Sequence, residues 1–242
     1  MKIVAIIQAR MGSTRLPGKV LEDLAGEPVL ARCVERARRA QTLDEVVVAT
    51  TTQPADRDIV QLCEERGWPW FRGSEDDVLD RYYRAASARR ADVVVRITSD
   101  CPLIEPGVVD MVVREFLARQ PGVDYVANTL QPRTFPRGLD TEVMSFGVLE
   151  RAWREDENPA WREHVTPYIR RHPDRFQSYG VSNDEDLSHM RWTVDTPEDL
   201  AFVRRIYEHF GHDRFSWRKV LTLLEAHPEW LDINRDVQQK TV

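Results

Sequence analysis

The sequence lacks any apolar run long enough to cross a membrane. No stretch approaches the roughly twenty apolar residues that a membrane helix requires. The N-terminus has one lysine and a short apolar segment, without the small-residue cleavage site that ends a signal peptide. Hydrophobic residues make up 42% of the chain and charged residues 31%, which is typical of a folded globular protein. We therefore expect a cytoplasmic protein without membrane contact.

Cysteine is scarce, and its spacing argues against two kinds of site. The chain has three cysteines and no C-x-x-C pair, so a disulfide framework and a thiolate zinc site are both poorly supported. Cys33 and Cys63 fall on the apolar faces of predicted helices, where a small buried thiol is the better interpretation. Histidine spacing of the H-x-x-x-H kind is also missing, which leaves a histidine metal site unsupported.

The chain has no excess of positive charge. Its formal net charge is −6, which argues against a surface that coats nucleic acid. A local basic pocket is compatible with that total. We expect small-molecule partners and no nucleic acid.

Strand-like and helix-like patterns alternate through the first half of the chain. Short apolar runs predict strands at Lys2–Ile7, Glu45–Thr50, Trp68–Phe71, Val93–Ile97 and Asp124–Ala127. Apolar stripes at helical spacing predict helices around residues 29–37, 59–63, 78–86 and 108–116. This order indicates an α/β fold, with a mostly parallel sheet and right-handed crossovers.

The alternation stops after Asn128. Residues 130–140 have no periodicity and contain two prolines and Gly138, which indicates a loop or an inserted arm. A further strand and two C-terminal helices are predicted at Thr141–Ser145, Pro197–Phe210 and Trp217–Ala226. Since neither a low-complexity linker nor an internal repeat divides the chain, we predict one domain over residues 1–242.

A short basic loop follows the first predicted strand. The apolar run Ile3–Ile7 leads into a polar segment that contains Arg10, Gly12, Ser13, Arg15 and Lys19. Open α/β sheets bind ligands at the carboxyl edge of their strands, and this loop delivers cations and backbone N–H groups to that edge. Arg10, Arg15 or Lys19 alone would be interpreted as a solvated surface charge. Three cations within ten residues favour a polyanionic ligand, most simply a nucleoside triphosphate.

Two familiar phosphate-binding motifs are missing from this loop. Five residues rather than four separate Gly12 from Gly18, and Val20 stands where a Walker A motif has serine or threonine. Pro17 also removes a backbone donor. The G-x-G-x-x-G fingerprint is absent as well. The loop is therefore expected to grip phosphates mainly with side-chain cations.

Two aspartates are placed to share a cation. Asp100 follows the predicted strand at Val93–Ile97, and Asp195 lies just before the predicted helix at Pro197. The competing interpretation of Asp100 is a turn residue. The competing interpretation of Asp195 is a helix cap, a role that Thr196 could also fill. If both converge on the ligand, two carboxylates about 4 Å apart repel by roughly 4 kcal/mol at an effective dielectric near 20. Protonation of one carboxylate or a divalent cation between them removes this repulsion, and magnesium is usual beside a triphosphate.

Seven segments carry a resemblance to a known family. They read IIQARMGSTRLPGKVL, VVATT, FRGSEDDVLDRYY, RITSDCPLI, PRGLDTEV, REHVTPYI and RWTVDTPEDL. Together and in this order they resemble the cytidylyltransferase family of the spore coat polysaccharide biosynthesis protein SpsF, which is related to the synthetases of CMP-activated acidic sugars. The resemblance extends from Ile3 to about Gln239. The family usually has glycine where Ser99 stands.

The resemblance implies a single nucleotide-diphospho-sugar transferase (GT-A-like) domain that transfers CMP from CTP to an acidic sugar and releases pyrophosphate. Residues 1–128 would form the nucleotide-binding half, and residues 129–242 the acceptor-binding half with the C-terminal helices. The resemblance and the insert after Asn128 also suggest a homodimer. Other readings are a nucleotidyltransferase that uses another nucleotide or a sugar phosphate, and a non-catalytic nucleotide-binding relic.

The resemblance also assigns roles to residues. Catalysis would depend on Arg10, Arg15 and Lys19, and magnesium would be bound by Asp100 and Asp195. Nucleotide contacts would come from Ile7, Gln8, Ala9, Arg10, Gly12, Ser13, Arg15, Lys19, Arg72, Gly73, Ser74, Asp77 and Asp100, with Arg81 as support.

The acceptor site is predicted in the second half of the chain. The candidates are Arg137, Asp140, Glu142, Arg162, His164 and Trp192, with Arg133, Glu163 and Thr166 beside them. Arginines suit a carboxylate or phosphate on the acceptor, and acidic side chains suit sugar hydroxyls. Surface salt bridging is the competing interpretation for the charged residues, and packing in the core is the competing interpretation for Trp192.

Overall fold

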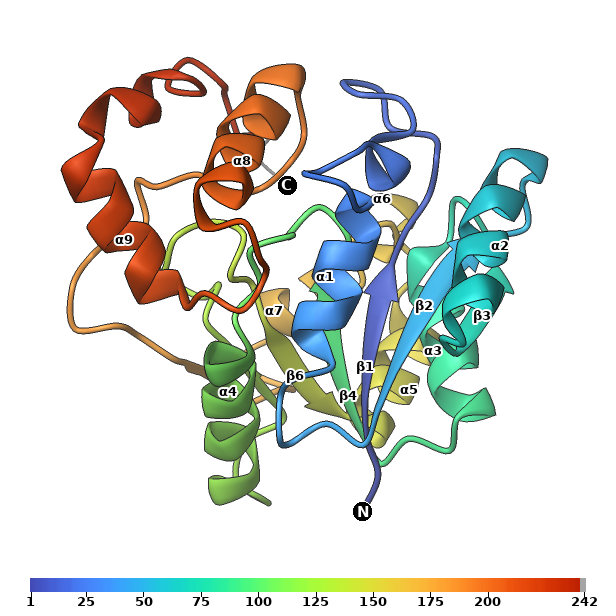
Figure 1. Ribbon diagram of the computed structural model, residues 1–242. Helices are drawn as coiled ribbons and strands as arrows, with labels where there is room; N and C mark the ends of the chain where they lie inside the picture. Colours follow the sequence, from blue (N-terminus) through green and yellow to red (C-terminus); the bar gives the residue numbers. More distant parts are fainter. Residues whose placement is uncertain (240–242) are drawn as a thin grey trace.

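A seven-stranded mixed sheet forms the centre of the protein in the computed structural model, which describes residues 1–239 (Figure 1). The strand order is β3-β2-β1-β4-β6-β5-β7. Strands β1 to β4 pair in parallel, whereas β6 runs antiparallel to β4 and β5. The strands are β1 (Ile3–Gln8), β2 (Glu45–Thr51), β3 (Trp70–Gly73), β4 (Val93–Thr98), β5 (Tyr125–Ala127), β6 (Glu142–Ser145) and β7 (Ser178–Gly180).

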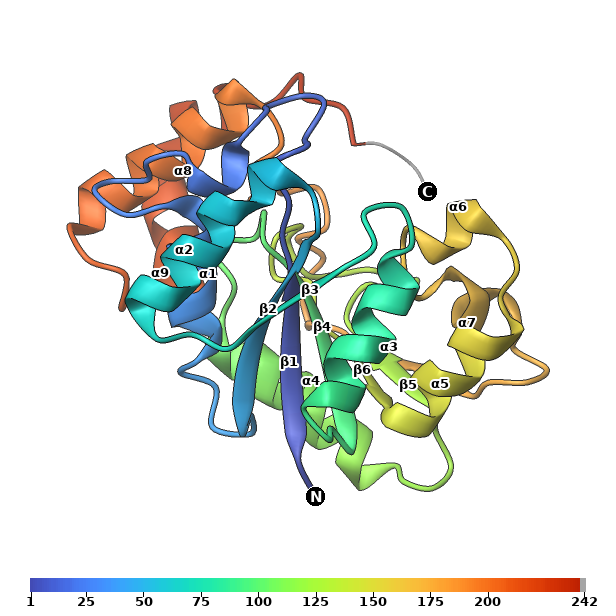
Figure 2. The same ribbon diagram turned by 90° about the vertical axis from the view of Figure 1, so that its right-hand side faces the viewer.

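Helices cover both faces of the sheet (Figure 2). In β1, Ala5 and Ile7 pack toward α1, α2, α4, α8 and α9, whereas Val4 and Ile6 pack toward α3, α5 and α7. This two-sided burial explains why the strands are almost continuously apolar. The helices are α1 (Val29–Ala37), α2 (Arg57–Arg66), α3 (Val78–Ala88), α4 (Pro106–Ala118), α5 (Phe146–Glu155), α6 (Pro159–Arg162), α7 (Pro167–Arg171), α8 (Pro197–Phe210) and α9 (Trp217–Ala226).

The predicted α/β architecture is confirmed. Every predicted strand is present, with ends shifted by no more than two residues, and α8 and α9 have the predicted bounds. No sequence pattern indicates β7, because its three residues are exposed and carry no apolar alternation.

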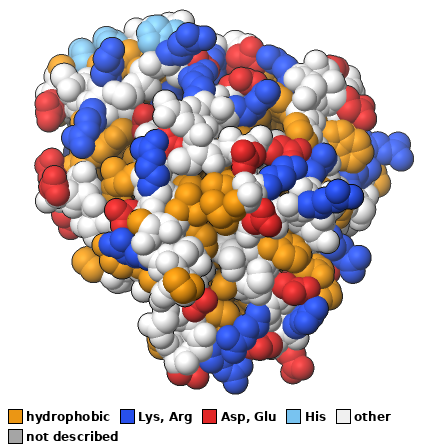
Figure 3. Space-filling model, turned by 90° about the horizontal axis from the view of Figure 1, so that it is seen from below, with side chains coloured by type: hydrophobic (Ala, Val, Ile, Leu, Met, Phe, Trp, Pro, Cys, Tyr) orange, Lys and Arg blue, Asp and Glu red, His pale blue; other side chains and the backbone are white. Residues whose placement is uncertain are grey.

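The cysteines are buried and unpaired, which confirms the interpretation of Cys33 and Cys63. Among residues 1–239, no helix combines the length and apolar character needed to cross a bilayer. Figure 3 views the end of the molecule at which β1 begins, and there basic and acidic side chains are interspersed between small hydrophobic areas.

The segment predicted as an inserted arm is irregular, as expected, but it packs back onto the protein and does not project. Phe135 and Leu139 are buried. The Asn128 side chain joins the two ends of the segment, since it accepts from the Thr141 N–H (2.8 Å) and donates to the Leu139 carbonyl (2.7 Å). Burial of these two apolar side chains, each contributing roughly 1.5–3 kcal/mol, holds the segment against the protein.

Gly138 allows this segment to pack closely against the backbone at Trp192, three residues before Asp195. Its φ is +106°, and an added Cβ would lie 2.8 Å from the carbonyl carbon and oxygen of Trp192. We expect Gly138→Ala to lower the free energy of unfolding by about 2–4 kcal/mol, from the left-handed strain and the overlap together. Urea denaturation measures this loss. Gly26→Ala is the matched control, because Gly26 also has positive φ (+85°) but open space around it. Equal losses in the two variants would contradict the steric argument.

Candidate active site

Buried Asp56 fixes the basic loop to the end of β2. It accepts from the Met11 N–H at Oδ1 (2.8 Å) and from the Thr51 N–H at Oδ2 (3.1 Å). The Gly18 N–H then donates to the Met11 carbonyl (3.0 Å), and Gly18 adopts the left-handed conformation at φ 72°. These bonds fold the loop back on itself, so that Lys19 begins a short helical turn directed toward β4.

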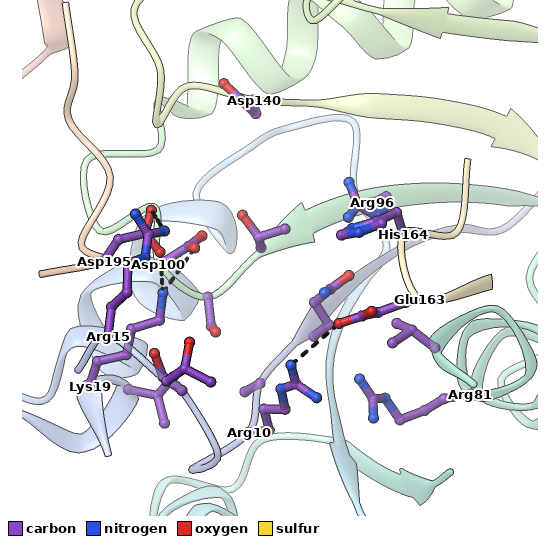
Figure 4. A pocket seen from close by; sticks show the side chains of 18 of the residues that line it. Arg10, Arg15, Lys19, Arg81, Arg96, Asp100, Asp140, Glu163, His164 and Asp195 are labelled. Atoms are coloured by element: carbon purple, nitrogen blue, oxygen red, sulfur yellow. Dashed lines mark hydrogen bonds and ion pairs between the residues drawn. The ribbon is translucent and has the colours of Figure 1, made fainter. Parts of the chain in front are cut away.

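A cavity of about 420 Å³ lies at the carboxyl ends of β1 and β4 (Figure 4). Its wall combines the basic loop with residues from much later in the chain. The lining residues are Gln8, Ala9, Arg10, Ser13, Thr14, Arg15, Lys19, Val20, Val78, Arg81, Arg96, Thr98, Ser99, Asp100, Asp140, Glu163, His164, Asp195 and Gln239.

At one end of the cavity, Lys19 lies between the two predicted metal ligands. Its Nζ donates to Asp100 Oδ2 (3.1 Å), to Asp195 Oδ1 (2.8 Å) and to the Val194 carbonyl (2.9 Å). All three ammonium donors are therefore satisfied. Burial alone would lower the pKa of Lys19, but attraction to Asp100 and Asp195 raises it above its usual value. Lys19 thus stays protonated and neutralises part of the repulsion between the carboxylates.

Two arginines hold the other oxygen of Asp195. Arg15 Nη2 and Arg191 Nη2 lie 2.8 and 2.7 Å from Asp195 Oδ2. Burial alone would raise the pKa of Asp195, but attraction to Lys19 and the hydrogen bonds around it lower the pKa to about 2. The capping role falls to Thr196, whose hydroxyl accepts from the Asp199 N–H. Asp195 is therefore not needed as a cap, and its carboxylate faces the cavity.

The residues at this end fit a magnesium ion. Asp100 and Asp195 direct carboxylate oxygens to one point, and oxygen donors are what Mg²⁺ prefers. Within residues 1–239 there is no cluster of three or more potential ligand side chains. Mg²⁺ typically takes one or two carboxylates and completes its shell with phosphate oxygens and water, so two are enough. The ammonium of Lys19 occupies the point that such an ion would need.

The other end of the cavity is cationic. Arg10 lies 3.6 Å from Glu163, and Arg81, Arg96 and His164 stand beside them (Figure 4). Arg81 is 1% exposed and donates from Nη1 to the Ser74 carbonyl (2.6 Å), while its Nε is buried without a partner. Burial and nearby Arg10 lower the pKa of Arg81. Buried cations of this kind attract an anionic or electron-rich ligand.

Several residues that were predicted to contact the nucleotide do not line the cavity. Arg72 donates to the Thr51 and Gln53 carbonyls and so ties β3 to the end of β2. Gly73 leaves room for the Arg81 side chain, which packs directly against it, since an added Cβ would be 3.0 Å from Arg81 Cγ. Four other predicted nucleotide contacts do not line the cavity: Ile7, Gly12, Ser74 and Asp77. Ile7 is buried in the sheet, and Asp77 caps α3 and pairs with Arg162.

The structure divides the predicted acceptor residues. Asp140 and His164 line the cavity. Glu142 and Trp192 are buried and do not, and Arg162 is bonded to Asp77 and to backbone carbonyls. The lining set likewise lacks Arg137, Arg133 and Thr166, and Arg133 pairs with Asp140.

Other lining residues were missed by sequence reasoning. Arg96 had a visible signal, because it is the one charge inside the apolar strand Val93–Thr98. The other unpredicted lining residues have no distinguishing sequence signal except that they lie close in sequence to predicted site residues or motifs. They are Thr14, Val20, Val78, Thr98, Ser99 and Gln239.

A cavity at the carboxyl ends of parallel strands, bordered by a cationic loop and paired acids, is typical of an α/β protein that binds a phosphorylated ligand. A family model of cytidylyltransferases matches residues 4–221. The chain is 33% identical to the spore coat polysaccharide biosynthesis protein SpsF of Bacillus subtilis, over 94% of this chain and 95% of that protein. It is 38% identical over 125 residues to 3-deoxy-manno-octulosonate cytidylyltransferase of Trichlorobacter lovleyi, covering 51% of this chain and 48% of that one.

A solved structure of a cytidylyltransferase from Leptospira borgpetersenii superimposes on the full length of both chains, with a TM-score of 0.92 and 33% identity. The chain belongs to the cytidylyltransferase family. It is a nucleotidyltransferase that uses CTP.

Proposed function

We propose that the protein transfers CMP from CTP to an acidic sugar, with magnesium as cofactor, and releases pyrophosphate. The observation that carries this proposal is the meeting of Lys19, Asp100 and Asp195 at one end of the cavity, beside the basic loop. A triphosphate placed there is surrounded by cations at its β and γ ends and has acids beside it that suit a divalent ion.

In this mechanism the protein mainly positions reactants and stabilises charge. An acceptor hydroxyl oxygen attacks the α-phosphorus while the bond between that phosphorus and the pyrophosphate oxygen breaks, and the hydroxyl proton is released to water. Lys19 and Arg15 exchange part of their bonding from Asp195 to the phosphates and neutralise charge that grows on pyrophosphate. Asp100 and Asp195 would hold Mg²⁺, which when bound neutralises negative charge on phosphate oxygens.

The cationic end of the cavity supports an acidic acceptor. Arg96 and His164 lie at the end of the cavity away from Lys19, and Asp140 and Glu163 offer acceptors for hydroxyl groups. The relative named for 3-deoxy-manno-octulosonate has a sugar acid as its acceptor. A sugar acid, with one anion and several hydroxyls, matches this mixture of side chains.

Pyrophosphate release tests the proposal. The purified protein should release pyrophosphate with CTP, Mg²⁺ and at least one member of a panel of sugar acids. We expect CTP to exceed UTP, ATP and GTP by about a hundredfold in kcat/KM, because sites that hydrogen-bond one base leave polar groups unpaired with another. Mass spectrometry identifies the product. Equal use of UTP, or turnover only with neutral sugars or sugar phosphates, would contradict the proposal.

A further inference from the structure

Arg96 is a charged side chain in an otherwise apolar strand. Its neighbours Val94 and Val95 are fully buried, and Arg96 itself lines the cavity. Burial alone would lower the pKa of Arg96, but Glu142 opposite it on β6 raises that pKa above the usual value. A permanently charged side chain is costly at such a position, and it is tolerated only where its charge is balanced.

Glu142 balances this charge, and two hydroxyl groups hold its carboxylate in place. One of its oxygens bonds Arg96 Nη1. The other accepts from the Tyr125 hydroxyl (2.5 Å) and the Thr166 hydroxyl (2.7 Å). Glu142 is 6% exposed and lies outside the cavity wall. It was predicted to contact the acceptor, but its contacts make it a positioning residue that fixes the direction of Arg96.

Arg96 keeps binding capacity after pairing with Glu142. Its Nε is buried and has no hydrogen-bond partner in the described structure. The guanidinium group binds carboxylates and phosphates by two parallel N–H bonds along one edge, and an unpaired Nε–H leaves such an edge to satisfy. An unsatisfied buried donor is destabilising, and a ligand oxygen that bonded this edge would remove that cost.

His164 stands next to Arg96 at the same end of the cavity (Figure 4). The following residue, Val165, has a φ of +69°, which is rare for a β-branched side chain. The strained turn directs His164 into the cavity while Thr166 reaches back to Glu142. Burial lowers the pKa of His164. Attraction to Glu163 opposes this, whereas repulsion from Arg96, Arg170 and Arg10 adds to it, so the pKa of His164 lies below its usual value.

We propose that Arg96, aimed by Glu142 and flanked by His164, binds the anionic group of the acceptor and so selects acidic acceptors. This inference rests on the proposed function and names the residue that recognises the acid. Two arginines of the predicted acceptor site are less suitable. Arg133 is bonded to Asp140 and to backbone carbonyls, and Arg137 is outside the cavity wall.

Arg96→Lys tests the inference, because lysine keeps the charge opposite Glu142 but loses the guanidinium edge. Arg137→Lys is the matched control at the rival position. With CTP-loaded protein, titration calorimetry measures the affinity for 3-deoxy-manno-octulosonate, for pyruvate as a small carboxylate, and for inorganic phosphate. We expect Arg96→Lys to weaken binding of the preferred anion by at least about tenfold, with CTP affinity unchanged within twofold, and Arg137→Lys to change neither. Tighter binding of pyruvate than phosphate by the unaltered protein assigns a carboxylate, and the reverse assigns a phosphate.

The double variant Arg96→Gln/Glu142→Gln controls for misfolding caused by an unbalanced buried charge, since it removes both charges together and keeps a hydrogen-bonded pair. It should match Arg96→Lys in weakened anion binding and match the unaltered protein in CTP affinity. Unchanged anion affinity in both variants overturns the inference, even if sugar acids are turned over. Weakened anion binding without turnover of any sugar acid overturns the proposed function and leaves the anion site in place.

Discussion

Replacing Asp195 with asparagine is expected to lower kcat/KM by about 10³-fold. Asp195 is the meeting point of Lys19, Arg15 and Arg191, and one amide cannot balance three cations. The cations then lose their fixed positions around the triphosphate, and one of the two proposed magnesium ligands becomes neutral. Removal of a single preorganised electrostatic group commonly costs 10²–10³-fold, and here two such effects coincide.

Steady-state pyrophosphate release at saturating Mg²⁺ measures the effect of Asp195→Asn. Asp184→Asn is the control, because Asp184 is an exposed residue outside the cavity wall. Thermal unfolding separates a chemical defect from a folding defect, and we expect Asp195→Asn to lose about 1–3 kcal/mol of stability. A variant that retains activity within tenfold would show that Asp195 serves only to anchor Arg191 and Arg15.

The α/β scaffold was predictable because its signals are local. Apolar runs such as Ile3–Ile7 and Val93–Ile97 are buried on both faces, so their composition alone marks them as strands. The capping box at Thr196 and the proline that follows it mark the start of α8 at the correct residue. Residues directly after such strands, as in the basic loop and at Asp100, could therefore be assigned to one edge of the sheet.

The partners of these residues were not predictable in the same way. The sequence left protonation or a divalent cation as answers to the repulsion between Asp100 and Asp195, whereas the structure has the ammonium of Lys19 between them. Lys19 is separated from Asp100 by 81 positions in the sequence and from Asp195 by 176 positions, and no periodicity encodes either contact. Glu142 was misplaced for the same reason, since its pairing with Arg96 depends on the antiparallel register of β4 and β6.

Arg72 shows a related limit. As a cation at the end of β3 it looked suited to a ligand, but its donors are used by the Thr51 and Gln53 carbonyls. Backbone carbonyls at strand ends are strong acceptors that a sequence does not display. Arginine, with five donors, satisfies them as readily as it binds anions.

Replacing Lys19 with methionine is expected to have two opposite effects. Methionine has a similar length but no charge, so phosphate binding and charge stabilisation are lost, and kcat/KM should fall by about 10²–10³-fold. The same change leaves Asp100 and Asp195 facing each other without the ammonium that now contacts both. Their mutual repulsion, roughly 4 kcal/mol for charges about 4 Å apart at an effective dielectric near 20, then favours any divalent cation that binds between them.

Binding of Mn²⁺ in the absence of nucleotide separates the two effects, because free Mn²⁺ is measured directly by electron paramagnetic resonance. We expect at least about tenfold tighter binding in Lys19→Met than in the unaltered protein, since the ion no longer competes with a fully bonded ammonium. Lys219→Met is the control, as Lys219 is exposed on α9 and outside the cavity wall. Mn²⁺ affinity that is unchanged in Lys19→Met would contradict a shared cation position. Lys19 would then act on the triphosphate alone, and the divalent ion would have to be held elsewhere in the cavity.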